Sequence, residues 1–314
     1  FQALLDTMGC LPEVTVVLGG DGRFFNKEAL QIFLKMAAAN GIAKIIVGKE
    51  GLLSTPALSY LMRQRGSQAG IMLSASHNKG GAQGDFGIKY NVKNGGAAPP
   101  EVTKKIYERT KSLAHYKICQ APDICLAQVG LFSLNNMAIE IVDSVALYAD
   151  FMEELFDFVQ IRSAAEKGLS LCFDAMHAVT GPYAVEIFEK RLGFAKGSVL
   201  NNLPLPDFGG QAPDPNPNNL QHLLAIMGKP NGPSLGAASD GDGDRNFIMG
   251  QKQLVAPSDS LAVLLAHSDV LKYYQGRVKG VARSMPTSKA VDQVAAHMNI
   301  PVYETPTGWK FFCS

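Results

Sequence analysis

The chain has 314 residues, 46% of them hydrophobic and 18% charged, and its formal net charge is +1. This length is typical of two or three domains, and the apolar content is enough for a buried core, which excludes a disordered protein. The near-neutral charge argues against a nucleic-acid partner, and no apolar run approaches the ~20 residues of a membrane span. Composition carries no information on the oligomeric state.

Five cysteines are present, an odd number without metal-binding spacing: Cys10, Cys119, Cys125, Cys172 and Cys313. Scattered cysteines of this kind are typical of reduced thiols rather than a disulfide framework. We therefore expect a cytoplasmic protein.

The first part of the chain alternates between apolar runs and helical periodicity. Strands are expected at residues 14–18, 42–47, 71–73 and 85–91, a loop at 48–54, and helices from 26, over 55–65 and over 100–113. The last helix is expected to turn Val102, Ile106 and Tyr107 inward. This β-α-β-α-β succession predicts one mostly parallel sheet with crossover helices.

The remainder repeats the same unit less regularly. Residues 114–142 are weakly periodic and are expected to be an excursion to the domain edge. Asp143 is expected to cap one long helix that runs to about Phe158. Residues 203–217 carry too many prolines and glycines for a helix or central strand.

A strand, a polar loop and a helix follow one another three times, from Val14, Leu169 and Val278. The repetition predicts an α/β protein of consecutive similar domains, each with a mixed, mostly parallel sheet and crossover helices. We expect boundaries at 1–145, 146–262 and 263–314, the last domain being incomplete.

One apolar run ends abruptly in the stretch Ser74-Ala75-Ser76-His77-Asn78-Lys79-Gly80-Gly81. Small polar side chains at the carboxyl end of a strand lie where open α/β sheets bind ligands, and glycines let the backbone approach an anion. Ser76 is the main candidate, and an ordinary turn is the alternative. Of the nearby His77 and Lys89, the lysine can carry a proton or pair with an oxyanion, although a solvated lysine is equally common.

Three aspartates, Asp240, Asp242 and Asp244, alternate with glycine. In an extended backbone residues i, i+2 and i+4 point the same way, so we expect the carboxylates to converge. Three hard oxygen ligands suit Mg²⁺. A calcium EF-hand loop is excluded, because its sixth place is Arg245 rather than Gly and its twelfth is Gln251 rather than Glu. An acidic surface turn remains the alternative.

A divalent cation beside a serine favours phosphoryl chemistry, because the ion neutralises charge on the transferred group. Serine alone is a poor nucleophile and needs a partner. The sequence lacks both the G-x-S-x-G elbow of esterases and the G-x-x-x-x-G-K-[ST] loop of nucleotide kinases, so neither class is favoured.

Five stretches carry a resemblance to a known family: 74–78, 84–91, 240–245, 283–288 and 306–310. Together they resemble the motifs of the α-D-phosphohexomutases, most closely those of the eukaryotic-type phosphoglucomutases, over residues 19–312. The resemblance implies an active-site cleft between domains and a sugar-binding third domain.

The resemblance also implies the chemistry. Ser76 matches the serine that carries a phosphoryl group, and Asp240, Asp242 and Asp244 match the ligands of one Mg²⁺, with a phosphoserine oxygen of Ser76 completing the set. The implied activity is that of an isomerase, a phosphoglucomutase. It would interconvert glucose 1-phosphate and glucose 6-phosphate, with glucose 1,6-bisphosphate as intermediate and activator.

Further residues match positions that contact the hexose phosphate: Ser76, His77, Lys89, Asp244, Arg245, Thr307 and Gly308. His77 and Lys89 match residues with catalytic roles, and Lys89 is a candidate proton carrier. Arg23 matches an arginine that supports the serine loop.

The chain departs from the family pattern at Ser74, usually Thr, and at Lys79, where Pro is commoner. The resemblance places an N-terminal loop before Phe1, and the rest of domain 3 and a fourth domain after Phe312; Cys313 and Ser314 do not continue the pattern. Two alternatives stay open: a non-catalytic phosphoglucomutase-like scaffold or secretion-linked protein, and a mutase for another hexose phosphate.

Overall fold

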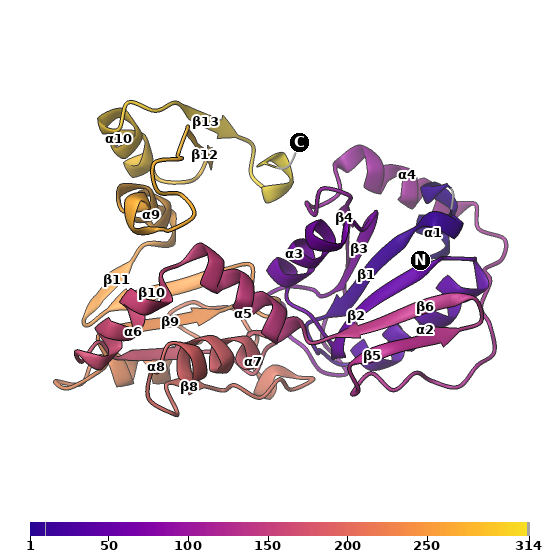
Figure 1. Cartoon of the computed structure of the whole chain (residues 1–314), viewed down its shortest axis with the longest axis horizontal. Coiled ribbons are helices and arrows are strands. Elements are labelled where there is room, and N and C mark those ends of the chain that lie inside the picture. The colour runs from indigo at the N-terminus through magenta and orange to yellow at the C-terminus, as the bar shows by residue number, and fades with distance from the viewer. Residues whose placement is uncertain (10, 313–314) are drawn as a thin grey trace.

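The computed structural model describes residues 1–9 and 11–312, so that Cys10, Cys313 and Ser314 lie outside the described residues. Three units follow one another along the chain, two with a large sheet and one with a small sheet (Figure 1). Short turns of 3-10 helix also occur along the chain: η1 (Leu11–Glu13), η3 (Phe208–Gly210), η4 (Pro257–Asp259), η5 (Ser268–Val270) and η6 (Trp309–Phe312).

The first unit is a six-stranded sheet of order β4-β3-β1-β2-β6-β5. Its strands are β1 (Thr15–Gly20), β2 (Lys44–Leu52), β3 (Ala69–Leu73), β4 (Ile88–Val92), β5 (Gly130–Leu134) and β6 (Met137–Val142). The four central strands run parallel and the two edge strands antiparallel, which confirms the predicted mixed, mostly parallel sheet.

Helices cover both faces of this sheet: α1 (Gln2–Met8), α2 (Asn26–Ala39), α3 (Thr55–Arg65) and α4 (Pro100–Lys111). Val16 and Leu18 pack into the core under α2, whereas Val17 between them packs on the other face against α3. A strand buried on both faces needs apolar residues at successive positions, and this explains the continuous apolar runs of the sequence.

The second unit is a five-stranded sheet of order β11-β10-β9-β7-β8. Its strands are β7 (Leu171–Asp174), β8 (Val199–Leu200), β9 (Leu235–Ser239), β10 (Asn246–Gly250) and β11 (Gln253–Val255). Its helices are α5 (Ser144–Leu155), α6 (Phe158–Glu166), α7 (Thr180–Ala184), the π-helix η2 (Val185–Arg191) and α8 (Gln221–Met227). Strand β7 runs parallel to its neighbours β8 and β9, and β10 and β11 continue antiparallel.

The third unit is small. Strands β12 (Val281–Ser284) and β13 (Val302–Thr305) pair in parallel beside α9 (Ser260–Ala266) and α10 (Ala290–His297). Arg283 on β12 is buried and pairs with Asp292 on α10 at 2.6 Å and Glu304 on β13 at 2.7 Å. This buried cation therefore ties the three elements together.

The first two units share an apolar core. Helix α5 packs on α3 and β2 of the first unit and on α7 of the second (Figure 1). Val179 and Tyr183 of the second unit belong to the same buried cluster as Val17 and Leu58 of the first. Loops at the ends of the two sheets are therefore held close together.

Several local expectations were wrong. Strand β2 continues to Leu52 through the expected loop, because its pairing with β1 resumes after a shift in register. The segment 114–142 contains β5 and β6, and β6 pairs with β2 inside the sheet. The helix capped by Asp143 is present but ends at Leu155, a little before the predicted Phe158, and a second helix, α6, follows it unpredicted, capped by Asp157, which accepts the Gln160 N–H at 3.0 Å. On α4, Ile106 packs against the core as expected and Val102 is partly buried, but Tyr107 is 60% exposed rather than inward.

Over the described ranges, no helix is both long and apolar enough to cross a membrane.

Candidate active site

The aspartate loop joins β9 to β10 in a hairpin. Asp240 Oδ1 accepts the backbone N–H groups of Gly243, Asp244 and Arg245, each at 3.1 Å. Gly243 adopts a φ of 78°, a left-handed conformation that glycine takes without strain. The predicted convergence of the carboxylates is thus present, but a tight turn produces it rather than the alternation of an extended strand.

Ligand oxygens of Asp240, Asp242 and Asp244 lie within 4.8 Å of one another. Asp240 and Asp242 are fully buried, and Asp244 is exposed. Burial, together with the neighbouring charges of Asp242 and Asp244, raises the pKa of Asp240 to about 7. The cluster could bind a metal ion, which would relieve this repulsion.

The hydrogen-bond partners of the two Asp242 carboxylate oxygens indicate whether the three aspartates suit a cation. Oδ2 accepts from Lys89 Nζ at 2.6 Å and from the Thr55 hydroxyl. Oδ1 is buried and has no hydrogen-bond partner among the described residues. A buried carboxylate oxygen is rarely left unpaired, so Asp242 Oδ1 is suited to coordinate a cation. The donor set of three carboxylates suits a hard divalent ion.

Ser76 lies against this loop although 164 residues separate it from Asp240, to whose Oδ2 it donates at 2.9 Å. Ser76 is 7% exposed and has a φ of 55°, an uncommon conformation for serine. A Cβ on Gly241 would lie 2.5 Å from the Ser76 carbonyl oxygen. The serine loop and the aspartate loop therefore touch, and only glycine fits at the contact.

Arg23 lies beneath the serine loop. Its guanidinium donates to the carbonyl oxygens of Ser76 at 3.0 Å and Asp85 at 2.7 Å. Asp21 holds the guanidinium at 2.8 Å and accepts from Ser74 Oγ at 2.6 Å, while Ser74 Oγ accepts the Ser76 N–H at 2.8 Å. This buried network holds the backbone of Ser76 from both sides.

The remaining candidate residues surround the same two loops. Lys89, on β4, lies 3.7 Å from Asp244 as well as against Asp242. Arg245 contacts His77 Nδ1, and its Nε lies 3.8 Å from Asp244.

A cavity of about 570 Å³ joins all three units, and Thr55, Asp244, Arg245, Thr307, Gly308 and Trp309 are among the residues that line it. The structure thus brings Thr307 and Gly308 to the aspartate loop, while the roles of the individual residues stay predictions.

Sequence reasoning missed Thr55, Asp21 and Ser74 as parts of the site. Thr55 opens α3, donates its hydroxyl to Asp242 and its N–H to the Asp242 carbonyl at 2.8 Å. No local signal could have found this contact, because 187 residues separate the partners. Asp21 and Ser74 also lie at the ends of apolar strands, so the same local signal that marked Ser76 could have found them.

Known protein domains match nearly the whole chain. Phosphoglucomutase/phosphomannomutase alpha/beta/alpha domain I matches residues 1–117, domain II matches 146–253 and domain III matches 257–314. The chain therefore belongs to the phosphoglucomutase/phosphomannomutase family, whose consecutive α/β/α domains correspond to the three units described above.

Among named relatives, the chain is 52% identical over 311 residues to a phosphoglucomutase of Rhizobium radiobacter and 50% identical over 300 residues to the chloroplastic phosphoglucomutase of Arabidopsis thaliana. These alignments cover 99% and 95% of this chain but 57% and 48% of the relatives. The chain thus spans about half the length of the curated relatives it matches.

A solved structure with a similar fold is the open form of the Paramecium exocytosis-sensitive phosphoprotein pp63/parafusin, also described as a phosphoglucomutase. It superposes with a TM-score of 0.92 at 42% identity, over 99% of this chain and 59% of that protein. A 24% identical phosphomannomutase-like structure from Thermus thermophilus, with a TM-score of 0.76, supports the fold alone.

Proposed function

We propose that the protein carrying this chain is a phosphoglucomutase, which interconverts glucose 1-phosphate and glucose 6-phosphate through a phosphoserine at Ser76. The observation that carries the proposal is the 2.9 Å contact of Ser76 Oγ with Asp240, inside a cluster of three carboxylates. The relatives named phosphoglucomutase, whose sequences are 52% and 50% identical to this chain, support the same activity.

In this proposal Asp240, Asp242 and Asp244 hold one Mg²⁺ together with a phosphoryl oxygen on Ser76. The unpaired Asp242 Oδ1 supports that assignment. The bound ion supplies positive charge that offsets the charge of the moving phosphoryl group. The backbone network around Arg23 orients Ser76, and the burial of Ser76 keeps water from the phosphoserine.

The proposed reaction has two transfers. The bond from phosphorus to Ser76 Oγ breaks as a bond forms to the 6-hydroxyl oxygen of glucose 1-phosphate, whose proton passes to the neutral amine of Lys89. The resulting glucose 1,6-bisphosphate turns over in the cleft and returns its 1-phosphoryl group to Ser76, while the proton held by Lys89 goes to the C1 oxygen, and glucose 6-phosphate is released. His77, Asp244, Arg245, Thr307 and Gly308 bind the hexose phosphate; the shared cavity of the last four supports this.

The test is a coupled assay of glucose 1-phosphate conversion with Mg²⁺ and catalytic glucose 1,6-bisphosphate. Ser76→Ala and Asp242→Ala are each expected to lower kcat more than about 1,000-fold, as removal of a nucleophile or a metal ligand does. Ser67→Ala is the matched control, because the Ser67 hydroxyl is buried without a partner among the described residues and lies outside the site. Mass spectrometry of the active protein should find phosphate on Ser76.

Two outcomes would contradict the proposal. A folded protein without turnover and without phosphate on Ser76 would favour the alternative left open by the sequence, a non-catalytic scaffold or secretion-linked protein. Faster turnover of mannose 1-phosphate or glucosamine 1-phosphate than of glucose 1-phosphate would favour another hexose phosphate mutase.

We also propose a cytoplasmic location. Cys119, Cys125 and Cys172, the described cysteines, are free thiols, as a reducing compartment favours. Cell fractionation with an antibody to the protein tests this placement.

A further inference from the structure

A loop of the second unit, residues 204–210, reaches into the first unit behind the serine loop. The Pro206 carbonyl oxygen accepts the N–H of Phe24 at 2.8 Å and the N–H of Gly81 at 3.0 Å. Phe24 follows Arg23, and Gly81 ends the stretch that carries Ser76. One carbonyl group therefore joins the two segments that hold the serine loop in place.

Phe208, in the same loop, fills the space between these segments. Its side chain is almost completely buried, with 2% exposed. The Arg23 guanidinium carbon lies 5.2 Å from the centre of the Phe208 ring, a cation–π distance. A Cβ on Gly80 would lie 2.8 Å from the same ring, so the ring also packs on the serine loop itself.

Residues with no role in the proposed phosphoryl transfer pack against the loop 204–210 on the side away from the serine loop. The backbone of Phe208 has a φ of 54°, which is uncommon for an aromatic residue. Such a conformation persists only where contacts with neighbouring residues stabilise it. The His177 ring lies against Gly209, where a Cβ would come within 2.7 Å, and the His177 carbonyl accepts the Leu205 N–H at 2.9 Å.

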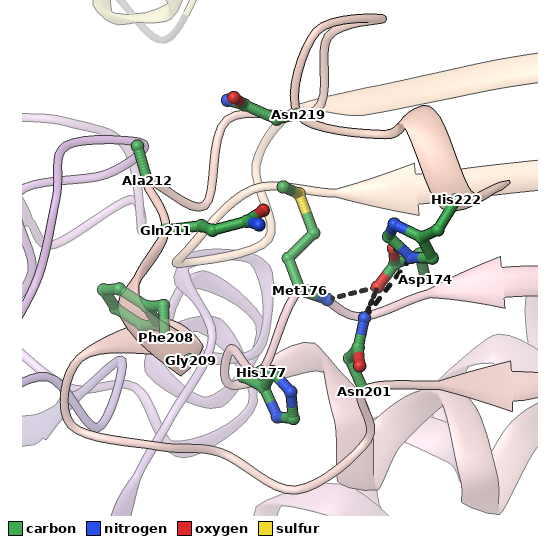
Figure 2. A pocket seen from close by; sticks show the side chains of 10 residues that line it. All are labelled: Asp174, Met176, His177, Asn201, Phe208, Gly209, Gln211, Ala212, Asn219 and His222. Carbon is green, nitrogen blue, oxygen red and sulfur yellow. Dashed lines mark hydrogen bonds and ion pairs between the residues drawn. The ribbon is translucent and has the colours of Figure 1, made fainter. Parts of the chain in front are cut away.

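Next to His177 in this part of the second unit lies the buried carboxylate of Asp174. Asp174 accepts from the Met176 N–H at 2.8 Å and from Asn201 Nδ2 at 2.9 Å, and pairs with His222. Figure 2 shows these groups and Phe208 around one cavity of about 240 Å³. The loop is thus attached to the ends of strands β7 and β8.

We propose that Phe208 is a positioning residue for phosphoryl transfer, which acts through Arg23 to hold Ser76 against the aspartate loop; the inference rests on the proposed function. The Arg23 guanidinium is held at its edge by Asp21 and donates to the Ser76 carbonyl oxygen. The ring of Phe208 restricts the guanidinium from its remaining side. Loss of the ring leaves Arg23 free to shift, and Ser76 shifts with it.

The first experiment compares Phe208→Leu with Phe194→Leu in the full protein. Phe194 is also buried in the second unit but packs against Phe188, away from the serine loop. Phe208→Leu should lower kcat by about 30- to 100-fold, the size expected for a small misplacement of a reacting group, with KM within about threefold. Phe194→Leu should lower the melting temperature and leave kcat within about twofold, since it changes only core packing.

The double variant tests the route through Arg23. If Phe208 acts through the guanidinium, Phe208→Leu should add less than about threefold to the effect of Arg23→Lys, whereas independent residues multiply their effects. Multiplied effects, or equal kcat losses in the two phenylalanine variants, would overturn the proposal. Should Phe208→Leu fail to fold, Phe208→Met serves in its place, because it conserves side-chain volume.

A readout independent of catalysis separates this inference from the proposed function. Amide hydrogen exchange of the peptide spanning 74–85 should become at least about tenfold faster in Phe208→Leu and stay unchanged in Phe194→Leu. Unchanged exchange in both variants overturns the positioning role. A wild-type protein that does not convert glucose phosphates refutes the proposed function, while the exchange data still decide whether Phe208 holds the serine loop.

Discussion

Asp240 joins the two loops of the candidate site. One of its oxygens accepts three backbone N–H groups of its own turn, and the other accepts the Ser76 hydroxyl. A single carboxylate thus shapes the aspartate loop and positions the serine. Because Asp240 is buried beside two further carboxylates, its pKa is raised, and a bound cation would favour its charged form.

The raised pKa of Asp240 predicts a pH-dependent metal affinity. In the cation-free protein, protonated Asp240 contributes stability below its unfolded pKa, and this contribution is lost as pH rises toward about 7. A cation must displace that proton, so Mg²⁺ should bind about tenfold more weakly at pH 6 than at pH 8. Isothermal titration calorimetry at the two pH values measures the difference.

Asp240→Asn is the control for this prediction. The variant should bind Mg²⁺ weakly and with less dependence on pH, because it has no proton to lose at this position. Equal affinity of the wild-type protein at pH 6 and pH 8 would contradict the assignment of the raised pKa to the cation site.

At the scale of single elements, the helix caps show how local sequence decides where an element begins. Asp143 accepts the Ala146 N–H at 3.0 Å and starts α5, and Asp157 accepts the Gln160 N–H at 3.0 Å and starts α6. The predicted helix therefore ends at Leu155, and a new helix begins because the second aspartate satisfies an N–H group that a continuous helix would bond within itself.

Removing a helix cap should therefore lower the free energy of unfolding without changing the candidate active site. Asp143→Ala is expected to lower the free energy of unfolding by about 1 kcal/mol, the usual value of an aspartate N-cap. Urea denaturation followed by circular dichroism measures it. Glu166→Ala, at an exposed position near the end of α6, should change stability by less than about 0.5 kcal/mol. A cost that is the same in both variants would mean that the cap contributes nothing.

At the scale of the whole molecule, the site exists only where the units meet. The first unit supplies Ser76 and Lys89, the second supplies the three aspartates, and the third brings Thr307 and Gly308 to their cavity. The shared core around Tyr183 and Leu58 keeps the first two units together. Chemistry at this site consequently depends on packing between units as much as on the reacting groups.

Gly241→Ala tests that dependence. A Cβ there would press on the Ser76 carbonyl oxygen at 2.5 Å, and separating the loops should lower kcat by about 100-fold through misplacement of Ser76. Gly250→Ala is the matched control, because its nearest atom would be 3.9 Å from the new Cβ. The coupled assay and the phosphate content of Ser76 provide the measurements. Full activity in Gly241→Ala would show that the two loops need not touch.

Much of this architecture was predictable because the sequence patterns that indicate it each lie within a short stretch of the chain. Apolar runs predicted the sheets, and the abrupt polar ends of such runs predicted which loops form the candidate site. The serine stretch and the aspartate loop were recognisable for the same reason, since each carries its chemistry within a few consecutive residues. Weak periodicity hid β6, whose place beside β2 depends on pairing with a strand about 90 residues earlier.

By itself the sequence determined the mixed α/β class, the helix cap at Asp143, the repeated unit and the two chemistry-bearing loops, because propensity and side-chain spacing act over a few residues. Only the tertiary structure decided that Thr55 would hold Asp242, that Phe208 would cover Arg23, and that a tight turn would bring the carboxylates together. These contacts join segments tens to hundreds of residues apart, and burial of the shared core between the units is what brings them within bonding distance.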